Sequence, residues 1–408
     1  METLKFVIVG HVDHGKSTLI GRLLYDTKSL PPDRLQEIKK GGDEKEEFAH
    51  LLDHLEEERS KGITIDTTQV FFRTSRREYV IIDAPGHVEF IRNMITGASQ
   101  AEAGVLIVDV TEGVKEQTRR HAYILALLGI KHIIVVVNKM DLVDYRRELF
   151  EKMREELESF LPSLGVEVKF YIPVSAWEGV NIARPSSRLS WFEGPSFLSA
   201  LDELPSRPSL KRGDFLFPIQ DVYRIKGEEI VVGRVEGGEV GKGDRLRILP
   251  GKEEGVVRKI LRFPQEVDKA QAGECVGMVL EGEISPRRGE VLCHADSPPS
   301  LHTRFQASIF WMSPQPAEKE KTYLLRCATQ ERNVSLTEIL TRMNSSTFEI
   351  LERNAYSLHN LEVGEVVMEV DRPLVVKPFQ DLPELGRFVL EKEGEVCAGG
   401  VVRRVGEG

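Results

Sequence analysis

The chain has 408 residues, of which 41% are hydrophobic and 29% are charged, and its formal net charge is −10. This length and composition predict a soluble, globular protein of two or three domains, each able to bury a core. Because no run of eighteen apolar residues occurs and the four cysteines lie far apart, we expect a cytoplasmic protein without a membrane span, a signal peptide or a disulfide framework.

The first half of the chain alternates short apolar runs with helical patterns. The apolar runs cover residues 6–9, 79–82, 105–108, 133–137 and 170–174. Continuous apolar runs are typical of parallel strands that helices cover on both faces, the α/β architecture. Since ligands of such sheets bind at the carboxyl ends of the strands, the segments that follow these runs form the candidate site.

The segment after the first run has the spacing G-x-x-x-x-G-K-[ST] of a phosphate-binding P-loop. Glycines let the backbone turn its N–H groups toward phosphate oxygens, and the following helix points its positive end at the same anion. Lys16 is placed to reach the β and γ phosphates, and the Ser17 hydroxyl is placed to ligate Mg²⁺. The predicted nucleotide-binding residues here are Gly10, His11, Val12, Asp13, His14, Gly15, Lys16, Ser17 and Thr18.

Residues 61–66 read Lys-Gly-Ile-Thr-Ile-Asp and follow a long charged connection. A hydroxyl on such a segment, that of Thr64, is suited to ligate Mg²⁺ and to sense the γ-phosphate. Taken alone, Gly-Ile-Thr-Ile is only a β-prone tetrapeptide, so this assignment depends on the neighbouring motifs.

The second apolar run ends in Asp83-Ala-Pro-Gly-His. An acidic residue at a strand end, Asp83, can hold Mg²⁺ through a water molecule. Gly86 offers a backbone N–H that can approach the γ-phosphate without a side chain in the way. His87 then falls at the start of a helical pattern, near the place of an attacking water. We predict that Lys16, Thr64 and His87 are catalytic, and that Ser17, Thr64 and Asp83 are the metal ligands.

Two further motifs indicate which base is bound. Asn138-Lys-Met-Asp follows the run at residues 133–137, and Ser175-Ala-Trp follows the run at residues 170–174. The Asp141 carboxylate can accept from two donors of guanine that adenine lacks, a difference that discriminates by roughly 10⁴-fold. Lys139 can lie over the base plane. Asn138 can tie its loop to the P-loop, and a backbone N–H among Ser175, Ala176 and Trp177 can meet guanine O6.

The second half of the chain has a different texture, with short alternating runs and glycine turns at close spacing. This pattern predicts small β-barrels. A proline-rich connection near residue 208 and a second one at residues 297–300 mark the boundaries. We therefore predict a P-loop GTP-binding domain over residues 1–208, followed by β-barrel domains over 209–298 and 299–408. Residues 335–343 fit either a helix or a β-segment.

This set and order of motifs resembles the translational GTPase superfamily of elongation factors Tu and one-alpha, over essentially the whole chain. The family roles carry over to Lys16, Ser17, Thr64, Asp83, His87, Asn138 and Asp141, with GTP or GDP and Mg²⁺ as the implied cofactors. Within the superfamily, residues 17–28, 92–99, 117–121 and 305–313 look more like the large GTPase subunit of bacterial sulfate adenylyltransferase. That subunit's P-loop usually reads Ser-Val-Asp-Asp, where this chain reads His-Val-Asp-His.

The second resemblance implies that GTP hydrolysis drives synthesis of adenosine 5′-phosphosulfate on a smaller ATP-sulfurylase catalytic subunit. The alternative is an elongation-factor-like GTPase that delivers an aminoacyl-tRNA, and a third possibility is a non-hydrolysing GTP-dependent scaffold. The acidic balance mildly favours the sulfate reading, because phosphate binding by nucleic-acid partners is driven mainly by Lys and Arg. A tRNA partner is not excluded.

Overall fold

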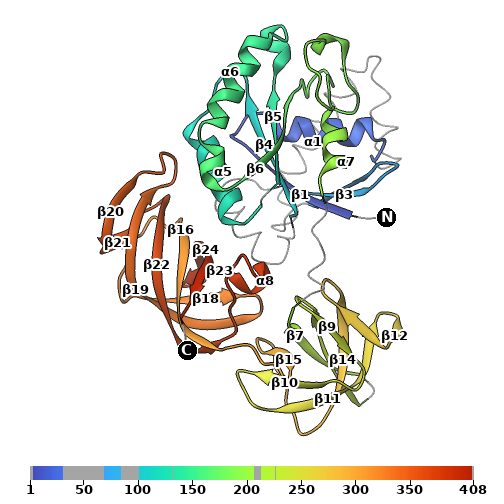
Figure 1. The fold of residues 1–408 in the computed structure, drawn as a ribbon, viewed down its shortest axis with the longest axis vertical. Coiled ribbons are helices and arrows are strands. Elements are labelled where there is room, and N and C mark those ends of the chain that lie inside the picture. The colour runs from blue at the N-terminus through green and yellow to red at the C-terminus, as the bar shows by residue number, and fades with distance from the viewer. Residues whose placement is uncertain are drawn as a thin grey trace. The chain divides into compact units, whose positions relative to one another are not determined.

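The computed structural model describes residues 3–30, 69–83, 101–130, 132–205, 213–225 and 227–406. The chain divides into two compact units, Met1–Ser206 and Arg207–Gly408 (Figure 1). The first unit is the α/β P-loop domain that the sequence predicts, and the second holds the two β-barrels.

The first unit is built on a six-stranded sheet with the order β2-β3-β1-β4-β5-β6. Its strands, in chain order, are β1 (Thr3–Val9), β2 (Gln69–Arg73), β3 (Glu78–Asp83), β4 (Ala103–Asp109), β5 (His132–Asn138) and β6 (Glu167–Pro173). All neighbours pair in parallel except β2, which runs antiparallel to β3 at the edge. The apolar runs of the sequence do not predict β2. The parallel strands place the ends of β1, β3, β4 and β5 at one edge of the sheet.

Helices cover both faces of this sheet. They are α1 (Lys16–Asp26), α5 (Glu116–Leu127), α6 (Arg147–Glu158) and α7 (Phe197–Glu203). Figure 1 shows α5 and α6 on one side of the strands and α1 and α7 on the other. Because side chains alternate along a strand, Ile134 and Val136 of β5 point to one face, where they join a buried cluster with residues of α1 and α7. None of the helices in the described parts of the chain is long and apolar enough to cross a membrane.

The first barrel of the second unit is closed by pairing of β10 with β11. Its ring runs β10-β15-β7-β8-β14-β11, and β12 extends from β11. The ring strands are β7 (Leu216–Ile225), β8 (Glu228–Arg234), β10 (Arg245–Leu249), β11 (Glu254–Arg262), β14 (Cys275–Glu281) and β15 (Val291–His294). The short strands are β9 (Glu239–Gly241), β12 (Gln265–Val267) and β13 (Lys269–Gln271). Closure leaves no open edge within the ring.

The second barrel has the same plan, with the ring β18-β23-β24-β16-β22-β19 closed by β18 and β19. The ring strands are β16 (His302–Trp311), β18 (Thr322–Cys327), β19 (Gln330–Asn344), β22 (Glu362–Leu374), β23 (Arg387–Lys392) and β24 (Glu395–Val405). The remaining elements are β17 (Ala317–Glu318), β20 (Ile350–Ala355), β21 (Ser357–Leu358) and the short helix α8 (Pro383–Gly386). Residues 335–343, which the sequence left open between helix and strand, lie inside β19.

Strand β5 ends in Asn138, the first residue of the Asn-Lys-Met-Asp motif, so its packing is a test of the fold. Ile134 is fully buried in the cluster between the sheet and helices α1 and α7. Replacing Ile134 by Ala removes buried methyl groups and leaves a cavity, and we expect the unfolding free energy of the first unit to fall by about 2–5 kcal/mol. Urea denaturation of the first unit measures this loss. Phe71→Ala is the control, since Phe71 is 64% exposed on β2 and its loss should change stability by under about 0.5 kcal/mol. Equal effects of the two changes would contradict the assigned core.

Candidate functional site

The loop between β1 and α1 needs glycine at two positions. Gly15 is the N-cap of α1 and has a φ of 92°, and a Cβ at this position would overlap the Asn138 amide nitrogen. A Cβ on Gly10 would lie 2.5 Å from Ile107 Cγ2 and 2.6 Å from the Ile107 carbonyl oxygen. Backbone conformation at Gly15 and close approach of β4 at Gly10 therefore both exclude a side chain.

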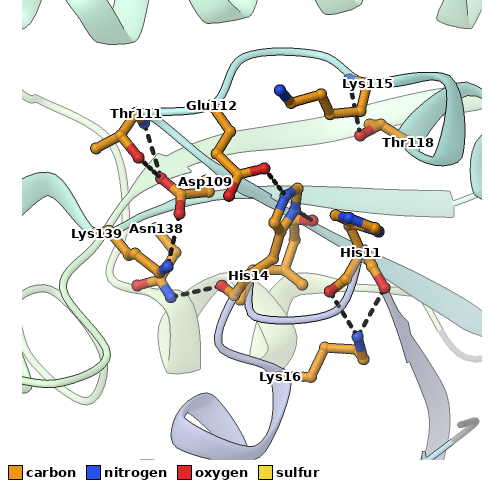
Figure 2. A network of polar contacts seen from close by, with 12 residues as sticks. His11, His14, Lys16, Asp109, Thr111, Glu112, Lys115, Thr118, Asn138 and Lys139 are labelled. Atoms are coloured by element: carbon orange, nitrogen blue, oxygen red, sulfur yellow. Dashed lines mark hydrogen bonds and ion pairs between the residues drawn. The ribbon is translucent and has the colours of Figure 1, made fainter.

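The Lys16 ammonium crosses this loop. Its Nζ donates to the carbonyl oxygens of Gly10 at 2.7 Å and His11 at 2.8 Å, as Figure 2 shows. Within α1, which is described from end to end, the first turn has no acidic residue and no side chain caps the N-terminal amides. A positive helix end and a lysine ammonium at one loop fit an anionic phosphate group.

His14 faces away from solvent within the same loop. Its side chain is fully buried, with Nδ1 3.3 Å from the Ile107 carbonyl oxygen and Nε2 3.6 Å from the Glu112 carboxylate. Burial lowers the pKa of His14 despite its contacts with the Ile107 carbonyl and nearby carboxylates. His14 is among the nucleotide-binding residues that the P-loop spacing predicts. In the structure its side chain contacts β4 and the loop after it, and its backbone carbonyl meets Asn138.

Asn138, at the end of β5, joins the two loops of the site. Its amide Nδ2 donates to the His14 carbonyl oxygen at 2.9 Å, and its Oδ1 accepts from the Ala176 N–H at 2.9 Å. The side chain is 2% exposed, so both bonds lie in a dry environment where a lost partner is costly. The P-loop and residues 175–177 are therefore held at fixed positions relative to each other.

Lys139 and Asp141 follow at the surface of the site. Lys139 has a left-handed φ of 64° at the start of the 3₁₀ turn Met140–Val143, and its Nζ lies 2.7 Å from Asp109 Oδ2. Asp141 is half-buried. Among the residues that the structure describes, the Asp141 carboxylate makes no hydrogen bond or ion pair. It is thus available to accept from a ligand.

The segment at residues 175–177 packs beneath this surface. Ser175 and Ala176 are buried, whereas Trp177 is 43% exposed. The Ala176 N–H donates to Asn138, and the Glu178 N–H donates to Ser175 Oγ at 3.1 Å. The Ala176 N–H, one of the amides predicted to meet guanine O6, is therefore already bonded within the protein, and the Ser175 N–H donates to the Val180 carbonyl oxygen at 3.2 Å.

Arg22 is a residue that sequence reasoning missed. It lies on α1 and is 3% exposed. Its Nε donates to the Ala176 carbonyl at 3.3 Å and its Nη2 to the Trp177 carbonyl at 2.6 Å. Arg22 therefore ties the segment at residues 175–177 to α1. A lone arginine within a stretch of buried leucine and isoleucine was the available signal.

Several predicted residues lie outside the described ranges. These are Thr64, Gly86 and His87. Asp83 is the last residue of β3 and is the register partner of Ile8 in β1, which puts its backbone at the same sheet edge as the P-loop. Ser17 is the second residue of α1. Oxygen donors at Ser17 and Asp83 are of the kind that Mg²⁺ prefers.

Comparisons with known proteins agree with this architecture. Residues 1–207 match the elongation factor Tu GTP binding domain, residues 228–293 match elongation factor Tu domain 2, and residues 304–403 match the GTP-eEF1A C-terminal domain-like family. The chain therefore binds GTP and GDP through its first domain, and that domain implies GTP hydrolysis.

Curated relatives extend over almost the full length of the chain. Elongation factor 1-alpha of Thermococcus gammatolerans is 37% identical, covering 98% of this chain and 97% of the relative. Elongation factor 1-alpha of Pyrococcus horikoshii is 38% identical, covering 99% and 98%. A solved structure of Sup35 complexed with GDP is 26% identical with a TM-score of 0.47, covering 100% of this chain and 95% of that one. These comparisons give no support to the resemblance to sulfate adenylyltransferase. The chain belongs to the translational GTPase superfamily and is of the elongation factor 1-alpha type.

Proposed function

We propose that this protein is a GTP-hydrolysing translation factor. It would bind an aminoacyl-tRNA in its GTP form and release the tRNA after hydrolysis. The observation that carries the guanine assignment is the Asp141 carboxylate, which is half-buried and unengaged among the described residues beside Asn138 and Lys139. A carboxylate in that state accepts two hydrogen bonds from guanine, whereas adenine offers no matching donors.

Phosphate binding is assigned to the P-loop. Lys16 donates to two loop carbonyls at 2.7 and 2.8 Å, and phosphate oxygens are stronger acceptors because they carry charge. Lys16 would exchange the carbonyls for phosphate and stabilise charge on it during hydrolysis. Ser17, Thr64 and Asp83 would hold Mg²⁺, which neutralises phosphate charge when bound.

Hydrolysis needs a positioned water molecule. His87 is assigned this role from its place after Asp83-Ala-Pro-Gly in the sequence. Phosphoryl transfer asks the protein mainly for positioning and charge stabilisation, so one imidazole that orients the water has a large effect. Thr64 would couple the same step to the segment around residues 61–66.

The RNA partner is proposed from the relatives that bear the elongation-factor name. One surface feature supports it. Phe263, at the turn between β11 and β12, is 97% exposed, and exposed aromatic rings are used to stack nucleotide bases. The sulfate-activating role remains a second candidate because of the resemblance of residues 17–28 and 305–313, but the relatives support the translation role better.

Asp141→Asn tests the base assignment. The amide keeps one acceptor but presents an N–H to guanine donors, so we expect GDP affinity to fall by roughly 100-fold or more. Xanthosine diphosphate, which has an acceptor in place of the exocyclic amine, should gain affinity. Competition against a fluorescent GDP analogue measures both. Asp144→Asn is the matched control, since Asp144 is exposed and its change should leave both affinities as they are. A D141N protein that still prefers GDP by the wild-type margin would disprove the assignment.

His87→Ala tests the catalytic assignment. We expect single-turnover GTP hydrolysis to slow by an order of magnitude or more, while GTP binding persists because no base or phosphate contact is assigned to this side chain. Quenched-flow measurement with excess protein separates hydrolysis from binding and product release. Hydrolysis at the wild-type rate would remove His87 from the mechanism.

The partner is tested by purification from native lysate in the presence of a non-hydrolysable GTP analogue. We expect tRNA to co-purify, to bind more weakly in the GDP form, and to dissociate as salt rises, because phosphate contacts release counterions. The eluate is also assayed for sulfate-dependent pyrophosphate release from ATP. A co-eluting smaller subunit with GTP-stimulated activity of that kind, and no RNA, would overturn the translation role and support the sulfate-activating one.

A further inference from the structure

The carboxyl end of β4 holds a buried carboxylate that belongs to no sequence motif. Asp109 is the last residue of β4 and the register partner of Asn138 at the end of β5. It is 1% exposed. Because Asp109 pairs with Asn138, it lies next to the start of the segment that carries Lys139 and Asp141.

Both carboxylate oxygens of Asp109 are engaged, and they serve different partners. Oδ1 accepts from the Thr111 backbone N–H at 2.8 Å and from the Thr111 hydroxyl at 2.7 Å. Oδ2 lies 2.7 Å from the Lys139 ammonium. Figure 2 shows Lys139 and Thr111 on two sides of this carboxylate. Oδ1 thus stabilises the turn after β4, and Oδ2 holds Lys139, the residue that follows β5.

The Asp109 carboxyl group is ionised, as pairing with the Lys139 ammonium requires. Burial acts to raise the pKa of Asp109, but hydrogen bonds from Lys139 and Thr111 outweigh it and hold the pKa below its ordinary value. The carboxylate is therefore ionised at neutral pH. The Lys139 side chain is 30% exposed, so without this anion its ammonium would move toward water and its stem would lose a fixed position.

We infer that Asp109 is a positioning residue for guanine-nucleotide binding, which acts by holding Lys139 in place beside the base-recognising carboxylate of Asp141. The inference rests on the proposed guanine site. A lysine stem that is already ordered loses less conformational entropy when a purine binds against it. Asp109 would therefore raise affinity for any purine that Lys139 covers, while Asp141 chooses among purines.

The competing explanation is that Asp109 only shapes the turn. Its backbone carbonyl accepts from the N–H groups of Glu112 and Gly113, and its Oδ1 bonds to Thr111 are those of a side-chain-stabilised turn. Asp109→Asn separates the two explanations. The amide keeps an oxygen that can accept from Thr111 but no longer attracts the Lys139 ammonium by charge.

The experiment is a double-mutant cycle on GDP affinity with Asp109→Asn, Lys139→Met and the double variant. Lys139→Met keeps an unbranched apolar stem and removes the ammonium. We expect Asp109→Asn to weaken GDP binding roughly tenfold in the wild-type background and to have no further effect when residue 139 is methionine. Inosine diphosphate should weaken by the same factor as GDP, since Asp141 is unchanged. Glu116→Gln is the matched control, a carboxylate-to-amide change at a side chain that is 72% exposed and pairs with Arg120, and it should leave GDP affinity unchanged.

Each other outcome counts against the inference. Equal loss of affinity in both backgrounds means that Asp109 acts through the turn and not through Lys139. Wild-type affinity in D109N means that Asp109 has no role in binding. If the amide prevents folding, Asp109→Glu replaces it, with the same expected dependence on Lys139. A wild-type protein that fails to bind GDP would overturn the proposed function itself, a result distinct from binding that is insensitive to Asp109.

Discussion

The buried amide of Asn138 is the contact on which the candidate site depends. It donates to the P-loop at His14 and accepts from the segment at residues 175–177. Neither bond can be exchanged for water at a side chain that is 2% exposed, so breaking one leaves a buried polar group unsatisfied at a cost of about 1–3 kcal/mol. The same amide, together with the left-handed φ of Gly15, sets the requirement for glycine at position 15. One side chain thereby joins the two loops to which we assign phosphate and base binding.

Much of the first unit could be predicted because its polar residues follow apolar strands. Asp83 and Asn138 were found in this way, since the ends of parallel strands meet at one edge. Asp109 follows the same rule after residues 105–108, but it belongs to no familiar motif, so the sequence does not indicate its role. Arg22 is a different case. Its partners are carbonyl groups far along the chain, and backbone oxygens carry no sequence signal.

For the second unit, the sequence predicts small β-barrels but not the pairing of their strands. Alternating runs indicate strands, but closure of each barrel depends on pairs such as β10 with β11 and β18 with β19, whose register the sequence does not encode locally. Residues 335–343 were ambiguous because a short apolar pattern fits both periods. The tertiary pairing of β19 with β18, β20 and β22 decides for the strand. Partner choice was the least predictable property, because the nucleotide motifs are needed whatever the barrels bind.

Lys16 and Lys139 contact different kinds of acceptor, and this difference bears on how each lysine can respond to a ligand. Two of the contacts of Lys16 are to neutral carbonyls, whereas Lys139 is paired with a buried, ionised carboxylate. An arriving phosphate competes easily with a carbonyl, because charged acceptors form the stronger hydrogen bonds. A phosphate competes poorly for Lys139, because the Asp109 carboxylate that holds this lysine is itself charged. In the proposed assignment, Lys16 would leave its two carbonyl partners for phosphate when nucleotide binds, whereas Lys139 would keep its pairing with Asp109.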